Sequence, residues 1–134
     1  MKCLIIDDDA SCCSMFKMAL DRQGECDTCS LGYDGINAHK KALFSGQPYD
    51  LIIIDIILPD INGQHVLECI RTEEIVNKID DIFQTKIILT TSLDDEENRK
   101  MAQGLKKGKE AYYIKSFANE GLREILMELG FYFN

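Results

Sequence analysis

The 134-residue sequence contains no long apolar run, and this narrows its class at once. A helix that crosses a bilayer takes roughly 20 consecutive, mostly apolar residues, and no segment approaches that length. Near the N-terminus only four apolar residues, at positions 3–6, precede an acidic stretch. That is too short for the core of a secretory signal peptide, which takes roughly 7–15 apolar residues. We therefore expect a cytoplasmic protein that does not enter a membrane.

Positively charged residues are also scarce. The sequence has 15 Lys and Arg but 23 Asp and Glu, which gives a net charge of −8. An acidic body repels phosphate backbones, so we expect no direct binding to nucleic acid. The length suits one domain, and the composition, 46% hydrophobic and 28% charged, is typical of a globular fold. We expect a single domain over residues 1–134, with no effector domain in this chain.

Six cysteines are present, but they lack the spacing of a metal site. Cys26 and Cys29 form a CxxC on a predicted strand, where residues three apart point to opposite faces. No second CxxC or His pair completes a zinc set. Cys12 and Cys13 are neighbours on a predicted helix and diverge by about 100°. We interpret the cysteines as free thiols that fill core space.

Short apolar runs typical of strands alternate with helical patterns along the chain. The predicted strands cover residues 3–6, 25–31, 49–55, 86–91 and 111–114. The predicted helices cover residues 12–20, 36–44 (after a turn at 34–35), 64–74, 95–107 and 122–129. Strict alternation with short connections predicts a (βα)5 fold, a doubly wound five-stranded parallel sheet in a flavodoxin-like, three-layer α/β/α arrangement.

Polar residues follow four of the predicted strands, at the edge where such sheets bind ligands. These residues are Asp7, Asp8, Asp9, Asp55, Thr90, Thr91 and Lys115. Carboxylates crowded there repel one another by about 4 kcal/mol per pair at about 4 Å and an effective dielectric of about 20. A divalent cation relieves this repulsion, and ligation by oxygen alone indicates Mg²⁺. A carboxylate beside Mg²⁺, a lysine and a hydroxyl is equipped for in-line phosphoryl transfer.

The same segments resemble response regulator receiver domains of two-component signalling, including the single-domain chemotaxis type, over essentially the whole chain. The matching segments are residues 5–8 (IIDD), 33–38 (YDGINA), 55–63 (DIILPDING), 89–90 (LT) and 112–115 (YYIK). The resemblance implies a phosphorelay module rather than a conventional enzyme, with self-catalysed phosphorylation and dephosphorylation as its only chemistry.

The resemblance also implies a role for each acidic residue. Asp55 is the expected phosphoacceptor, and its phosphoryl group comes from a histidine kinase or a phosphotransfer protein. Asp8, Asp55 and the backbone carbonyl of Ile57 are the expected direct ligands of Mg²⁺, and Asp7 acts through water.

Three further residues are expected to act on the phosphoryl group or to respond to it. Thr90 and Lys115 contact the phosphoryl oxygens, and Tyr112 changes rotamer together with Thr90. The resemblance implies that this change alters the surface formed by the fourth helix, the fifth strand and the last helix, which controls an unknown downstream protein partner.

The chain departs from the family pattern around the site. Ser116 follows Lys115 where the family usually has proline, often with a cis peptide. Because a cis bond before a non-proline residue costs about 3–4 kcal/mol, we predict a trans bond with a shifted loop. Ile57 and Ser92 occupy positions that influence how readily water attacks the acyl phosphate in the family. Since Ile57 cannot hold water by hydrogen bonding, we predict slow self-dephosphorylation.

Two other segments are unusual. Residues 72–85 form a longer connection than the family usually has, with apolar spacings that favour packing on the body over a partner surface. Residues 130–134 are apolar for a chain end, and three interpretations stay open: packing under the last helix, a homodimer contact, or the stub of a longer protein.

Other functions fit less well. A haloacid-dehalogenase-type phosphatase needs a second aspartate at the position of Ile57. A flavodoxin-like cofactor carrier needs a phosphate-binding loop after the first strand, where Asp7 and its neighbours repel phosphate. Two variants of the receiver assignment stay open: a degenerate receiver that acts as a docking module without phosphorylation, and a receiver fragment of a larger regulator or hybrid kinase.

Overall fold

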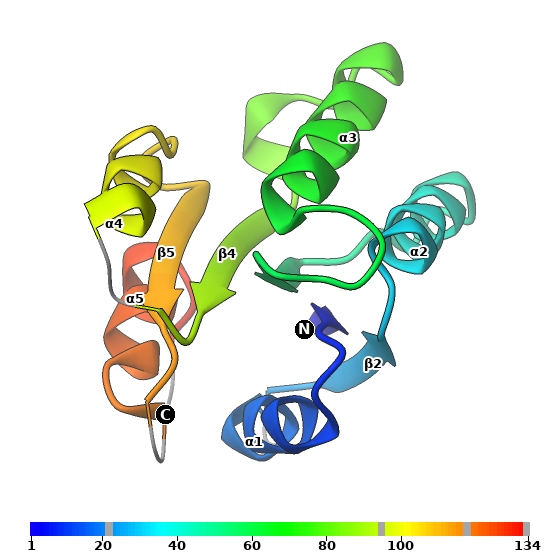
Figure 1. The fold of residues 1–134 in the computed structure, drawn as a ribbon. Coiled ribbons are helices and arrows are strands. Elements are labelled where there is room, and N and C mark those ends of the chain that lie inside the picture. The colour runs from blue at the N-terminus through cyan, green and yellow to red at the C-terminus, as the bar shows by residue number, and fades with distance from the viewer. Residues whose placement is uncertain (21–22, 94–95, 117–118, 133–134) are drawn as a thin grey trace.

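A computed structural model describes residues 1–20, 23–93, 96–116 and 119–132. The strands are β1 (Lys2–Ile6), β2 (Glu25–Cys29), β3 (Leu51–Asp55), β4 (Lys86–Thr91) and β5 (Glu110–Ile114). The helices are α1 (Ala10–Leu20), α2 (Gly32–Phe44), α3 (Gly63–Val76), α4 (Glu96–Gln103) and α5 (Leu122–Glu128), with a short 3₁₀ turn η1 (Asp81–Phe83). All strand pairs are parallel, as predicted for a doubly wound sheet, and the strand order is β2-β1-β3-β4-β5 (Figure 1).

The central strand β3 explains why the sheet is covered on both faces. All five of its residues are buried, as its run of consecutive apolar side chains predicts. Ile52 and Ile54 join the core beneath α2 and α3, whereas Leu51 and Ile53 join the core beneath α1 and α5. Figure 1 shows these two pairs of helices on opposite sides of the sheet. The three-layer α/β/α arrangement is confirmed.

Five of the six cysteines lie in or against the core, as predicted. All six are free thiols, and Cys3 is completely buried. Cys26 packs against the core beneath α1 and α5, and Cys29 packs against the core on the other face of the sheet. The two sulfurs of the CxxC therefore point away from each other.

Helix α2 begins four residues earlier than the sequence pattern indicated, so the predicted turn at residues 34–35 is wrong. The backbone amides of Gly32 and Tyr33 donate to the carboxylate of Asp60, at 2.8 and 2.9 Å. These bonds satisfy amides that the first turn of a helix leaves without intrahelical acceptors. The capping residue lies far along the chain, where local sequence patterns do not reveal it.

The predicted packing of the apolar side chains of residues 72–85 onto the body is wrong for four of them. Helix α3 runs on to Val76, and η1 follows it. Ile75, Val76, Ile82 and Phe83 are all at least 67% exposed. These four side chains face outward, so a partner surface, the alternative weighed against packing, stays open for this segment.

The end of the chain contributes in part to the core. Phe131 packs against the core beneath α1 and α5, whereas Tyr132 is exposed. Packing under the last helix thus holds for Phe131, and residues 133–134 lie outside the described part. Within the described residues, no helix combines the length and the apolar character needed to cross a membrane.

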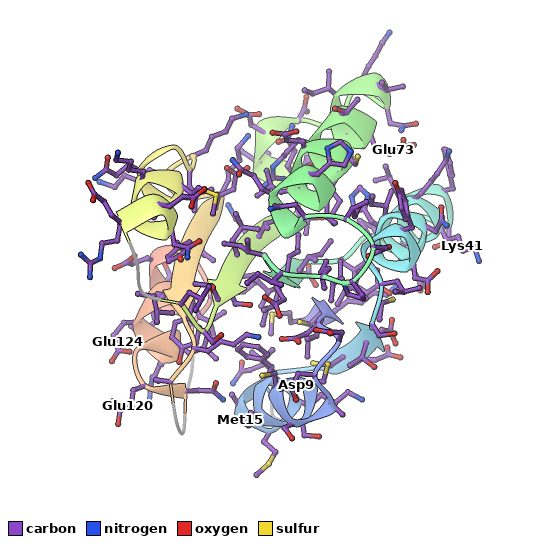
Figure 2. All side chains as sticks on the ribbon, in the orientation of Figure 1. Asp9, Met15, Lys41, Glu73, Glu120 and Glu124 are labelled. Atoms are coloured by element: carbon purple, nitrogen blue, oxygen red, sulfur yellow. The ribbon has the colours of Figure 1, made fainter. Side chains whose placement is uncertain are left out.

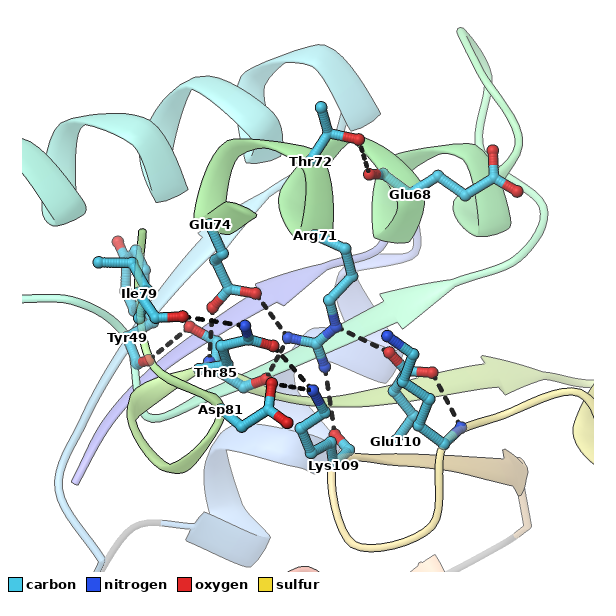
Figure 3. Close-up of polar contacts among 12 residues, drawn as sticks. Tyr49, Glu68, Arg71, Thr72, Glu74, Ile79, Asp81, Thr85, Lys109 and Glu110 are labelled. Atoms are coloured by element: carbon cyan, nitrogen blue, oxygen red, sulfur yellow. Dashed lines mark hydrogen bonds and ion pairs between the residues drawn. The ribbon is translucent and has the colours of Figure 1, made fainter. Parts of the chain in front are cut away.

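A buried ionic network fastens residues 72–85 to the sheet (Figure 3). Arg71 donates from Nε to Glu110 Oε2 and from Nη1 to Glu74 Oε1, both at 2.7 Å. Its Nη1 also donates to the carbonyl of Thr85 at 2.8 Å, and the amide of Thr85 donates to Glu74 Oε2 at 2.7 Å. All three charged side chains are less than a tenth exposed. The network thereby joins α3 to the first residues of β4 and β5.

Replacing Arg71 tests this network. We expect Arg71→Met to lower the free energy of unfolding by about 3–5 kcal/mol, because it leaves two buried carboxylates without a counter-charge. Urea unfolding followed by circular dichroism measures the change. Lys109→Met is the matched control, because Lys109 pairs with the exposed Asp81 and such pairs contribute about 1 kcal/mol or less. Equal losses in the two variants would contradict the assigned role of Arg71.

Candidate functional site

The predicted site residues gather at the carboxyl edge of the sheet. Asp55, the last residue of β3, lies in register with Thr90 of β4. Asp7 and Asp8 follow β1 directly, next to β3 in the sheet. Carboxylate oxygens of Asp7, Asp8 and Asp55 lie within 4.8 Å of one another. The convergence expected from the strand pattern is therefore present.

Lys115 connects two of these acids. Its Nζ donates to Asp7 Oδ2 at 2.7 Å and to Asp55 Oδ2 at 3.1 Å. Its backbone amide donates to the carbonyl of Thr91 at 2.7 Å, which fixes the position where β5 ends. The described residues contain no cis peptide bond, so the predicted trans bond between Lys115 and Ser116 is confirmed. The predicted shift of the following loop stays a prediction.

The third acid after β1 has a different place. Asp9 lies at the start of α1 (Figure 2), where its Oδ1 accepts from the amides of Ser11 and Cys12 at 2.8 and 3.3 Å. These bonds hold the pKa of Asp9 below its ordinary value. The side chain of Asp9 thus caps α1. The backbone amide of Asp9 donates to Asp7 Oδ1 at 2.9 Å and so helps to orient the acidic pocket.

Burial and charge act in opposite directions on the acceptor candidate. Burial raises the pKa of Asp55 above its ordinary value, although Lys115 and the amide of Ile57 partly offset the shift. Burial alone would lower the pKa of Lys115, but its bonds to Asp7 and the charge of Asp55 raise it instead. The ammonium therefore stays charged, and two carboxylates compete for it. A further cation would relieve that competition.

The loop after β3 is held close to the acceptor. The amide of Ile57 donates to Asp55 Oδ1 at 3.1 Å, and the side chain of Ile57 is 57% exposed. Gly63 packs directly against the backbone of Asp55, and any larger residue would collide with the Asp55 carbonyl. Asn62 caps α3 by accepting from the amide of Gln64 at 2.7 Å. The Pro-x-x-x-Gly segment thus brings the start of α3 against the end of β3.

The two switch candidates lie beside the pocket. Thr90 is fully buried, and its hydroxyl donates to the carbonyl of Ile54 at 3.4 Å rather than to the acidic group. Tyr112 packs against the core beneath α2 and α3, whereas Tyr113 packs on the opposite face, edge-on to Phe16. The two neighbouring tyrosines thus lie on opposite faces of the sheet, as the alternation of side chains along a strand requires. The roles expected of Tyr112 and Thr90 stay predictions.

The comparisons with known sequences identify a family. The chain matches the family described as "Response regulator receiver domain" over residues 3–127. It is 33% identical over 118 residues to the transcriptional regulatory protein CusR of Escherichia coli, covering 88% of this chain and 46% of that protein. It is 34% identical over 122 residues to the oxygen regulatory protein NreC of Staphylococcus carnosus, covering 91% and 51%. The chain thus spans about half the length of these relatives.

Solved structures have the same fold. The response regulator TrrA of Thermotoga maritima, determined in complex with Mg²⁺-BeF, superposes with a TM-score of 0.69 at 30% identity, covering 96% of this chain and 97% of that one. A two-component response regulator from Cytophaga hutchinsonii has a TM-score of 0.73 at 21% identity, covering 96% and 95%, and shows the fold alone.

Together, the fold and the site define a doubly wound signalling domain with an acidic pocket at the carboxyl edge of its sheet, not a conventional enzyme. The chain belongs to the response regulator receiver domain family. The triad of Asp7, Asp8 and Asp55 is typical of the Mg²⁺ site of receivers, and its oxygen-only donors fit that ion. Receiver domains interact with kinases and with downstream proteins.

The raised pKa of Asp55 predicts how its charge affects stability without metal. A carboxyl whose pKa is raised on folding stabilises the fold while protonated, and that contribution is lost as the pH rises through the raised pKa. We therefore expect Asp55→Asn, in EDTA, to unfold at higher urea concentration than wild type at about pH 7.5 and to lose this advantage towards about pH 4.5. The exposed Asp34→Asn is the control. A variant less stable than wild type at the higher pH would contradict the prediction.

Proposed function

We propose that the chain is a phosphorelay receiver that accepts a phosphoryl group on Asp55 from a phosphohistidine of a histidine kinase or phosphotransfer protein. The observation that carries this proposal is the meeting of three carboxylates within 4.8 Å, with Lys115 bonded to two of them. The relative TrrA, whose structure contains Mg²⁺-BeF, supports the choice of ion. The regulatory relatives CusR and NreC support a role in signalling.

Each residue at the pocket has its own role in the proposed reaction. Asp8, Asp55 and the Ile57 carbonyl would hold Mg²⁺, with Asp7 acting through water, and the bound ion would shield the negative charge of the incoming phosphoryl group. An Asp55 oxygen attacks phosphorus along the line of the breaking P–N bond, and the histidine of the donor leaves as the imidazole. In the acyl phosphate formed at Asp55 the negative charge lies on the phosphoryl oxygens, so Lys115 can pair with one of them.

The signal would then pass to the surface of α4, β5 and α5. Thr90 has a hydroxyl that is held only by a long bond of 3.4 Å to its neighbouring strand, so rotation towards a phosphoryl oxygen costs little. Tyr112 follows that movement and changes the surface that an unknown downstream protein contacts. Tyr112 packs against the same core cluster as Met101 of α4, which supports such a link.

Phosphorylation by a small donor tests the chemistry directly. We expect wild type incubated with acetyl phosphate and Mg²⁺ to gain one phosphoryl group by intact mass, and EDTA or Asp55→Asn to abolish the gain. Asp34→Asn should behave as wild type, because Asp34 is exposed on α2. No adduct on folded wild type would contradict the proposal and favour the docking module without phosphorylation.

Ile57 sets the expected lifetime of the phosphorylated state. Its exposed apolar side chain lies next to Asp55 and cannot hydrogen-bond an attacking water. We expect Ile57→Asn to speed the decay of phospho-Asp55 severalfold in Mg²⁺, followed by intact mass over time. Val76→Asn, which polarises an exposed apolar side chain at the far end of α3, should leave the decay unchanged. Equal decay of wild type and Ile57→Asn would refute this explanation.

A further inference from the structure

Asp60 makes a contact that the proposed chemistry does not use. It lies in the β3–α3 loop (residues 56–62), yet both of its oxygens accept hydrogen bonds from another element, the first turn of α2. Leu31, at the N-cap of α2, has a side chain that cannot accept such bonds. The amides of Tyr33 and Gly32 lower the pKa of Asp60, so its carboxylate is ionised at neutral pH. Asp60, 28 residues after Gly32, therefore caps α2 in place of a residue next to the helix.

The same loop is anchored on its other side. The amide of Ile56 donates to the carbonyl of Thr90 at 2.9 Å, and the amide of Gly63 donates to the carbonyl of Ile56 at 2.8 Å. Ile57 lies between this anchor on the sheet and the Asp60 contact with α2. The backbone carbonyl expected to bind Mg²⁺ is thus carried by a segment that is fastened at both sides.

The surroundings of Asp60 are shaped for this contact. A Cβ added to Gly32 would come within 2.6 Å of Ile61 Cγ1 and 2.9 Å of a methyl group of Val66. The absence of a side chain at Gly32 lets the loop approach the helix closely enough for two bonds from one carboxylate. The start of α2 and the β3–α3 loop therefore have complementary shapes at this contact.

We propose that Asp60 is a positioning residue for the metal site: by clamping the loop to α2, it holds the Ile57 carbonyl in place before Mg²⁺ arrives. This inference rests on the proposed function, which makes that carbonyl a ligand. A ligand that is already ordered binds its ion without the entropic cost of ordering the loop. Loss of the clamp should weaken Mg²⁺ binding while leaving the metal-saturated site intact.

The test compares wild type with Asp60→Asn and with the charge-matched control Asp34→Asn, which lies in the same first turn of α2. Asparagine keeps the size of the side chain, but it offers one acceptor oxygen and a donor amide, so it cannot accept from both Gly32 and Tyr33. Asp60→Ser, which also offers a single small acceptor, is a second variant should the first fold poorly.

Three measurements separate positioning from simple capping. Mg²⁺ titration by calorimetry should show roughly tenfold weaker binding for Asp60→Asn and no change for Asp34→Asn. Hydrogen exchange in EDTA should become faster in residues 56–62 as well as at the start of α2. Phosphorylation by acetyl phosphate should need more Mg²⁺ for half its maximal rate, with the maximal rate itself close to that of wild type.

The outcomes distinguish this inference from the function on which it rests. Unchanged Mg²⁺ affinity in Asp60→Asn, with faster exchange confined to α2, would make Asp60 a helix cap alone and overturn the inference. A wild type that binds no Mg²⁺ in the same titration would overturn the proposed function, and the inference with it. Weaker binding in both Asp60 variants but not in Asp34→Asn supports the clamp.

Discussion

The arrangement of the whole site depends on one shared ion pair, in which a single ammonium group donates to two carboxylates. Lys115 bonds to Asp7 and Asp55, and Asp8 adds a third negative charge within 4.8 Å. Because Asp55 is largely buried, its charge is costly, and its raised pKa reflects that cost. The chain thus retains a pocket that one more cation would stabilise, and this residual repulsion is the physical basis for the metal-dependent chemistry proposed there.

Parallel strand geometry is what makes such crowding predictable from sequence. The apolar run that ends in Asp55 had to be a central strand, and the acids after β1 had to lie at the same edge, because parallel strands share their carboxyl ends. The position of Lys115 could be predicted by the same rule, because Lys115 comes directly after β5. The parallel sheet, its layers and the identity of the pocket residues could therefore be predicted without coordinates.

Features that depend on long-range polar contacts could not be predicted in this way. The early start of α2 needs Asp60, and the course of residues 72–85 needs Arg71 bonded to Glu110, 39 residues away. Hydrophobic spacing indicates which side chains can be buried, but not which face finds a partner. Ile75 and Phe83 have the right spacing and remain exposed, because the buried charges of Arg71 and Glu74 already fasten the segment.

The two edges of the sheet consequently differ in how completely their charges are paired. At the amino edge every charge of the Arg71 network has a short partner, which fixes the first residues of β4 and β5. At the carboxyl edge the charges outnumber their partners, and Thr90 makes one long hydrogen bond. A change in charge at Asp55 therefore acts on the end of the sheet that is least constrained, while the opposite end stays fixed. This asymmetry favours the proposed transmission from Asp55 through the buried Thr90 and Tyr112 to α4, because the side chains that would move lie away from the fixed amino edge of the sheet.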